Sequence, residues 1–207
     1  MNTVPDQMFS NSHMDALKEL GSMGTAHAAT ALSEMIQRKV TMPIPKVEWV
    51  KFANVTDFVG GPETVVLGIV VPLTGGIKGM MMYLMKLEAA HDVAASVLGV
   101  PHQGDPMEFS AMELSVIEEL GNIMISSYLS PLAGLTNSKI ESSIPYVSID
   151  MANAILSVPA IEFGKSVDEV LFIESQIVID DSSPSGCFIF VPHVESFTEV
   201  LKALGVE

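Results

Sequence analysis

The sequence predicts an α+β fold built from two similar halves that share one antiparallel sheet. Glu19 recurs 100 residues later as Glu119, and Pro45 recurs at the same offset as Pro145. Each half also follows the same order of patterns: a long helix, a strand, a hairpin and a short helix. These observations favour a pseudo-two-fold arrangement with the two long helices, which carry the repeated residues, together on one face of the sheet.

Prolines limit the predicted strand of the first half. Pro43 and Pro45 should confine a strand at 39–50 to a sheet edge or break it. Residues 51–61 fit no single pattern. The elements expected are a helix at 13–37, a strand at 39–50, hairpin strands at 63–73 and 77–84, and a helix at 88–98.

The hairpin needs separate justification, because the apolar run at 65–85 is about long enough to span a bilayer. Pro72, the Gly75-Gly76 pair and Lys78 interrupt this run. Two strands joined at the glycines explain it better than a transmembrane helix does.

The second half repeats this order. Ser110 and Glu113 are spaced as a capping box at the start of a long helix, and Pro131 predicts a bend near its end. The segment after residue 149 is left unassigned. The elements expected are a helix from 110 towards 135, a strand at 139–149, strands at 170–179 and 186–191, and a helix at 195–204.

The domain organisation follows from the repeat. We expect residues 1–12 to form a flexible tail and residues 13–207 to form one domain. Its two repeats span about 13–102 and 108–207, with a linker at 103–109.

Composition excludes several classes of protein. The formal net charge of −15 disfavours binding to nucleic acid or insertion into an anionic membrane, and favours a basic surface on a partner. The one cysteine, Cys187, excludes an internal disulfide framework and lies in an apolar run, as expected for a buried inert thiol. With no disulfide framework, a reducing cytoplasm is the expected compartment, and residues 1–12 lack the basic and apolar regions of a signal peptide. The five histidines show no short-range metal motif, so no metal site is expected.

The motif Ser115, Glu119, Asn122 carries the chemistry that we expect of this chain. In a helix these positions share one face. An amide such as that of Asn122 accepts a hydrogen bond from water while donating another to an anionic oxygen. This suits phosphoryl hydrolysis, in which positioning of the attacking water does most of the work. Glu119 would then dock a cation of a partner.

The complete motif resembles the signature of the CheC, CheX and FliY phosphatases of chemotaxis. That signature is Asp or Ser, three residues, Glu, two residues, Asn, twenty-two residues and Pro, and the second half matches it through Pro145. In the first half Asp15, Glu19 and Pro45 match, but Ser22 replaces the asparagine. Two motifs in one chain of this length resemble CheC more than CheX.

The resemblance implies a chemotaxis phosphatase that hydrolyses the phosphoaspartate of a CheY-like response regulator. Asn122 would position the water in line, and Glu119 would engage the regulator's active-site lysine. The regulator would hold the Mg²⁺, so the chain would need no cofactor of its own. The receptor deamidase CheD is a second implied partner. Because Ser22 lacks the paired donor and acceptor of an amide, the first site is expected to be weak or silent.

Plainer interpretations remain open for the supporting residues. Asp15 and Ser115 suit the first turn of a helix, where the helix dipole favours them. Pro45 and Pro145 suit a structural role in the following strand. The repeated Gly21 and Gly121 indicate a close approach of another backbone, within the fold or from a partner. The alternative function is a non-catalytic adaptor that binds CheD or the phosphorylated regulator.

Overall fold

A seven-stranded antiparallel sheet forms the centre of the molecule in the computed structural model, which describes residues 11–163, 169–179 and 185–203. Both β5 and β6 pair with the outer side of β3, and the short strands β1 (Val40–Thr41) and β8 (Val178–Ile179) pair separately. The order across the main sheet is β2 (Lys46–Lys51), β7 (Glu169–Gln176), β9 (Ser185–Pro192), β4 (Gly79–Lys86), β3 (Val65–Gly75), then β5 (Ile140–Ser142) and β6 (Tyr146–Met151).

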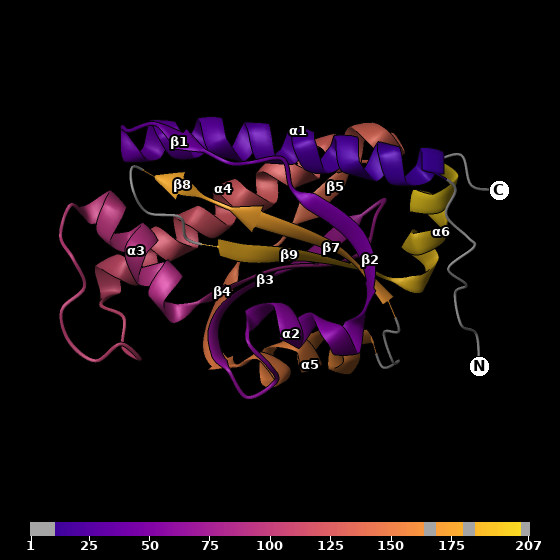
Figure 1. Ribbon diagram of the computed structural model, residues 1–207. Helices are drawn as coiled ribbons and strands as arrows, with labels where there is room; N and C mark the ends of the chain where they lie inside the picture. The colour runs from indigo at the N-terminus through magenta and orange to yellow at the C-terminus, as the bar shows by residue number, and fades with distance from the viewer. Residues whose placement is uncertain (1–10, 164–168, 180–184, 204–207) are drawn as a thin grey trace.

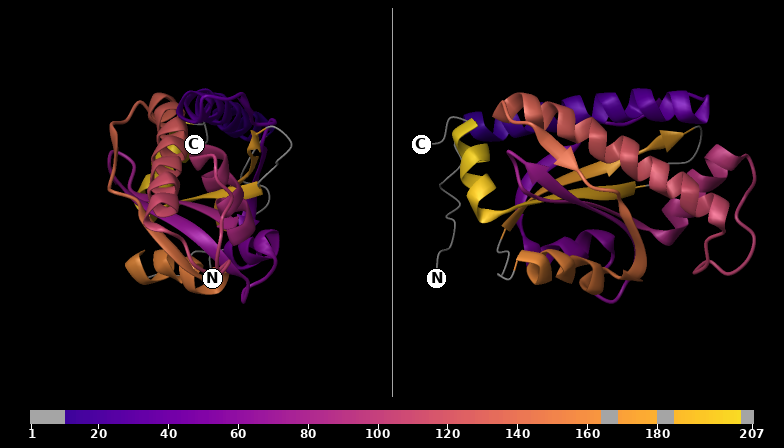
Figure 2. Two further views of the ribbon diagram at one scale, coloured as in Figure 1. Left: turned by 90° about the vertical axis from the view of Figure 1, so that its left-hand side faces the viewer. Right: turned by 180° about the vertical axis from the view of Figure 1, so that it is seen from behind.

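The helices cover both faces and both ends of this sheet. The long helices α1 (Asn11–Ile36) and α4 (Ala111–Thr136) lie side by side over one face (Figure 1). On the opposite face lie α2 (Val55–Val59), preceded by the 3-10 turn η1 (Phe52–Asn54), and α5 (Ala152–Phe163). At the two ends stand α3 (Leu87–Leu98) and α6 (Val194–Ala203), as Figure 2 shows from behind. The predicted α+β fold with two long helices on one face is confirmed.

The two halves exchange strands across the sheet. Strand β2 of the first half pairs with β7 of the second, while β6 of the second half pairs with β3 of the first. The register repeats too, because Val47 lies opposite Ile173 and Val147 lies opposite Ile69. Strands β4 and β9 pair at the centre and join the two halves. The pseudo-two-fold axis therefore passes between β4 and β9.

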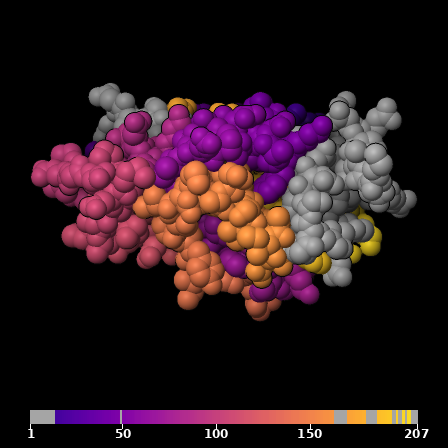
Figure 3. Space-filling view, turned by 90° about the horizontal axis from the view of Figure 1, so that it is seen from below, coloured from indigo at the N-terminus to yellow at the C-terminus, as the bar shows by residue number. Residues whose placement is uncertain are grey.

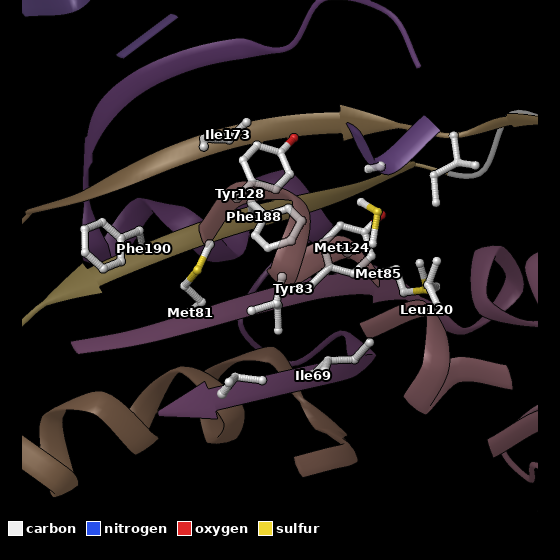
Figure 4. Close-up of a cluster of buried hydrophobic side chains, with 14 of the residues drawn as sticks. Ile69, Met81, Tyr83, Met85, Leu120, Met124, Tyr128, Ile173, Phe188 and Phe190 are labelled. Carbon is white, nitrogen blue, oxygen red and sulfur yellow. The ribbon is translucent and has the colours of Figure 1, made fainter. Parts of the chain in front are cut away.

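The continuous apolar run of the hairpin is explained by burial on both sides of the sheet. On β4, alternate side chains face the long helices, among them Met81, Tyr83 and Met85, where they pack in one cluster with Met124, Tyr128 and Phe188 (Figure 4). Their neighbours on β4 face α2 and α5 and belong to a second cluster: Met80, Met82 and Leu84. No described helix is long and apolar enough to cross a membrane.

The second cluster closes the face opposite the long helices. Val55 and Val59 of α2 pack there with Ala152, Ile155 and Leu156 of α5. Seen from below, α5 and the segment of η1 and α2 form neighbouring bands of the surface (Figure 3). The burial of Cys187 in this cluster raises the pKa of its thiol to about 12, as expected for an inert cysteine.

Helix α4 begins and ends as its residues dictate. The Ser110 hydroxyl accepts from the Glu113 N–H, and the Glu113 carboxylate accepts from the Ser110 N–H, so the predicted capping box is confirmed. The helix continues through Pro131 to Thr136 and is capped by Asn137, whose φ of 47° is left-handed.

Several segments differ from the sequence-based expectation. The predicted strand at 39–50 is broken into two, one of the two outcomes expected of Pro43 and Pro45, whereas the break of the strand at 139–149 before β6 was not expected. The unassigned stretches before residue 62 and after residue 151 contain α2 and α5. Residues 1–10 of the predicted tail lie outside the described residues, and α1 already includes the other two.

At Gly24 of α1 the long helices are closely packed, because the Tyr128 ring of α4 lies against this residue. A Cβ atom at Gly24 would clash with Cδ1 of Tyr128, whereas one at Gly134 would meet no atom within 4 Å. We predict that Gly24→Ala lowers the free energy of unfolding by about 1–3 kcal/mol, because the ring must shift in a packed core. The control Gly134→Ala should leave stability unchanged or raise it by up to about 1 kcal/mol. Guanidinium titrations measure both, and equal effects would contradict this close packing.

Candidate functional site

Helix α4 presents the predicted motif on its outer face. Ser115, Glu119 and Asn122 are all exposed. The apolar residues between them turn inward and are buried: Val116, Ile117 and Leu120. The helical spacing deduced from the sequence therefore holds, and the polar side chains share one exposed face.

The two central side chains of this face are available for a partner. Within the described part of the chain, no hydrogen bond or ion pair engages the side chain of Glu119 or Asn122. Positions 119 and 122 are one helical turn apart, about 4.5 Å along the axis. A carboxylate and an amide can thus contact neighbouring groups of the same bound molecule.

A shallow depression lies beside these two residues, where α4 meets α1. Its lining comes from both helices: Glu119, Asn122, Ile123, Ser126 and Ser127 from α4, and His27 and Ala31 from α1. Sequence patterns assign no functional role to His27 or Ala31. The repeat offered a signal for both, because equivalent helices packed antiparallel about a two-fold axis bring their middle segments together.

The first motif lies in an equivalent position but differs in its chemistry. Glu19 is exposed and lines a second depression further along the same helix pair, next to Pro131 and Gly134, and His27 borders both depressions. Ser22 donates its hydroxyl proton to the Lys18 carbonyl at 2.9 Å. Asp15 forms an exposed ion pair with Lys18, with 3.6 Å between Oδ1 and Nζ. The serine hydroxyl is therefore already engaged by its own helix.

The repeated glycines of the motif have packing roles within the fold. A Cβ at Gly21 would lie 2.7 Å from Cγ2 of Val47 and 3.3 Å from Cγ of Pro45. A Cβ at Gly121 would lie 2.7 Å from Cγ2 of Ile69 on β3. Each long helix therefore needs glycine where it rests on a strand.

The two motif prolines stand in different surroundings. Pro45 is buried against α1 and directly precedes β2, whereas Pro145 is half-buried and directly precedes β6. Both therefore stand at the start of a sheet strand, as the structural interpretation expects.

Two histidines lie in a separate cluster, in which His91 is buried and His102 is half-buried. His91 and His102 both contact Glu113 at the start of α4, although the sequence predicted no grouping of histidines. Residues 91, 102 and 113 are too far apart in sequence for any short-range motif. Only the folding of the connection between α3 and α4 brings them together.

The similarity of this chain to known proteins identifies its family. The model of a family described as CheC-like matches residues 13–48 and 112–149, the two motif regions of the repeat. The CheY-P phosphatase CheC of Bacillus subtilis (strain 168) is 30% identical over 93% of both chains. This chain belongs to the CheC-like family. It is a homologue of a phosphatase that acts on a phosphorylated response regulator, which confirms the predicted enzyme class and the connection to chemotaxis.

Solved structures with lower identity confirm the fold. FliY of Thermotoga maritima has a TM-score of 0.75 with 19% identity, covering 96% of this chain and 98% of that one. A complex of CheX with CheY, BeF₃ and magnesium from Borrelia burgdorferi has a TM-score of 0.51 with 15% identity. That match covers 82% of this chain and 96% of the other.

Proposed function

We propose that this chain hydrolyses the phosphoaspartate of a CheY-like response regulator, and that the second motif performs the reaction. The observation that carries the proposal is the pair Glu119 and Asn122, exposed and unengaged in a homologue of a CheY-P phosphatase. The depression beside them is open enough to receive a protein surface.

The amide of Asn122 orients the attacking water. Hydrolysis of an acyl phosphate needs a water in line with the bond that breaks, and an amide holds that water without adding negative charge beside the phosphoryl group. A carboxylate at the same position would repel the phosphoryl oxygens. Asn122 therefore contributes mainly by positioning.

The carboxylate of Glu119 docks the regulator. One turn from Asn122, it contacts a cationic group of the partner, such as the active-site lysine that the resemblance implies. The Mg²⁺ that neutralises the phosphoryl oxygens is supplied by the regulator, in keeping with the magnesium of the CheX complex. The deamidase CheD remains a second proposed partner, without an assigned surface.

The first motif is weak or silent in this proposal. The Ser22 hydroxyl is shorter than an asparagine side chain and donates to Lys18 within its own helix. Glu19 remains exposed and assists docking.

Replacing Asn122 separates hydrolysis from binding. We predict that Asn122→Ala lowers the accelerated hydrolysis of a phosphorylated regulator by at least about tenfold, because the water loses its orienting amide. Affinity for the beryllofluoride-activated regulator should change little. Phosphate release and isothermal titration calorimetry measure the two effects.

The matched control is Asn153→Ala, an exposed asparagine of α5 on the opposite face of the sheet. It should retain wild-type hydrolysis. Full activity of Asn122→Ala with unchanged binding would favour the adaptor function instead.

Replacing Glu119 tests docking. We predict that Glu119→Ala raises the Kd for the activated regulator by about tenfold, since a charge-assisted hydrogen bond is lost. The control is Glu118→Ala, an adjacent exposed carboxylate that points in another direction around the helix. Both variants lose one negative charge, so an equal rise in Kd would indicate general electrostatic attraction rather than a docking contact.

A further inference from the structure

Three side chains converge at the joint between the two halves. His91 comes from α3, His102 from the connection that follows it, and Glu113 from the first turn of α4. The Nδ1 atoms of His91 and His102 lie 3.2 Å and 2.8 Å from the same oxygen, Oε1 of Glu113. His91 and Glu113 are only 8% and 7% exposed, so bulk water cannot easily substitute for these contacts.

The opposite nitrogen of each ring faces a backbone carbonyl. His91 Nε2 lies 3.0 Å from the Pro106 oxygen, and His102 Nε2 lies 3.1 Å from the Asp105 oxygen. A carbonyl can only accept, so each Nε2 carries the proton. In a neutral imidazole Nδ1 then has no proton and carries a lone pair. The Nδ1 lone pairs of both rings therefore point towards the same carboxylate oxygen, Oε1 of Glu113.

Protonation of the Nδ1 atoms does not fully remove the repulsion between their lone pairs and the carboxylate oxygen. If both rings carried a second proton, two imidazolium cations would lie with their centroids 3.7 Å apart, and they would repel each other. If only one ring did, the other Nδ1 would still face Oε1 with a lone pair. A cation shared between the three acceptor atoms removes both difficulties.

Glu113 is prepared to act as an anionic ligand. Hydrogen bonds donated to a carboxylate favour its anionic form, and Ser110 supplies two of them, from its N–H and from its hydroxyl. Ser110 donates to Oε2, at 2.8 Å from each of its two donors. The other oxygen, Oε1, is thus left to the histidines.

We propose that His91 Nδ1, His102 Nδ1 and Glu113 Oε1 bind a Zn²⁺ ion, with solvent as the fourth ligand. Two imidazoles and a carboxylate form a donor set that zinc prefers. Zinc bonds of about 2.0–2.2 Å place tetrahedral ligands about 3.3 Å apart, close to the observed spacings around Oε1. Hydrogen bonds from the far nitrogens of metal-bound histidines to backbone carbonyls are the usual outer support of such sites.

The ion would have a structural role. It would fasten the connection between the halves to α3 and to the first turn of α4. Glu113 precedes Asn122 by nine residues, about 13.5 Å along the helix, so the ion would hold the helix that carries the motif without reaching the phosphoryl group. Because the ring planes are inclined by only 31°, the rings must turn further apart for both lone pairs to reach one ion. This inference departs from the sequence-based expectation of no metal site, and it does not depend on the proposed function.

The test uses the full chain without a polyhistidine tag, stripped of metal and titrated with Zn²⁺ against a chromophoric chelator. We expect one equivalent to bind, Zn²⁺ to raise the Tm, and Co²⁺ to give visible absorption typical of four-coordinate nitrogen and oxygen ligation. His91→Gln, His102→Gln and Glu113→Gln should each weaken Zn²⁺ binding by at least about tenfold. Glutamine at 113 preserves the capping box, so this variant tests the ligand without removing the helix start.

The control is His27→Gln, an exposed histidine of α1 outside the cluster, which should bind as the wild type does. Circular dichroism establishes that each variant is folded. The proposal is overturned if the wild type takes up no stoichiometric Zn²⁺, or if folded Glu113→Gln and His102→Gln bind it with wild-type affinity.

Discussion

The close antiparallel contact between α1 and α4 is the constraint on which the rest of the structure depends. At its centre the Tyr128 ring lies over Gly24, and its hydroxyl contacts the Thr25 hydroxyl at 3.1 Å. The same ring packs on Phe188 of the central strand β9, with 4.5 Å between centroids. Burial raises the pKa of Tyr128 to about 12, so the phenol keeps its proton for this hydrogen bond. The contact fixes which helix faces turn inward, and therefore leaves Glu19 and Glu119 outside.

Strand exchange makes this arrangement cooperative. Each half supplies a strand that pairs with a hairpin of the other half. Separating the two halves would therefore expose unpaired strand edges and the shared cores. The fold therefore does not depend on the chemistry of either motif face. Ser22 can replace an amide on one exposed face while Gly21, next to it, must stay small beneath Val47. The motif thus combines glycines that the packing of the fold requires with exposed residues that this packing does not require.

Much of the fold and of the motif was predictable, because these features are local in the sequence or are repeated in it. The offset of 100 residues identified equivalent helices, and helical spacing put Ser115, Glu119 and Asn122 on one face. The capping box needed only residues 110 and 113. The short helices α2 and α5 escaped prediction: α2 has only five residues, and Pro159 interrupts the pattern of α5.

Contacts between distant parts of the chain could not be predicted from sequence patterns. Strand exchange, the contribution of His27 to the depression by Asn122, and the meeting of His91, His102 and Glu113 all depend on tertiary packing. No periodicity in one sequence records such contacts. Their detection requires the topology of the sheet and of the connection between the halves.

The central claim is that the two long helices present equivalent exposed faces. Hydrolysis should then occur at whichever face carries an asparagine amide beside its glutamate. The most direct test transfers the asparagine from the second motif to the first. It compares Asn122→Ala with the double variant Ser22→Asn/Asn122→Ala, by the rate at which a phosphorylated CheY-like regulator loses its phosphoryl group. The account predicts that the double variant recovers part of the acceleration that the single variant lacks, because Glu19 is already exposed beside position 22. A double variant that is folded, binds the regulator and stays as inactive as Asn122→Ala would contradict the equivalence of the two faces.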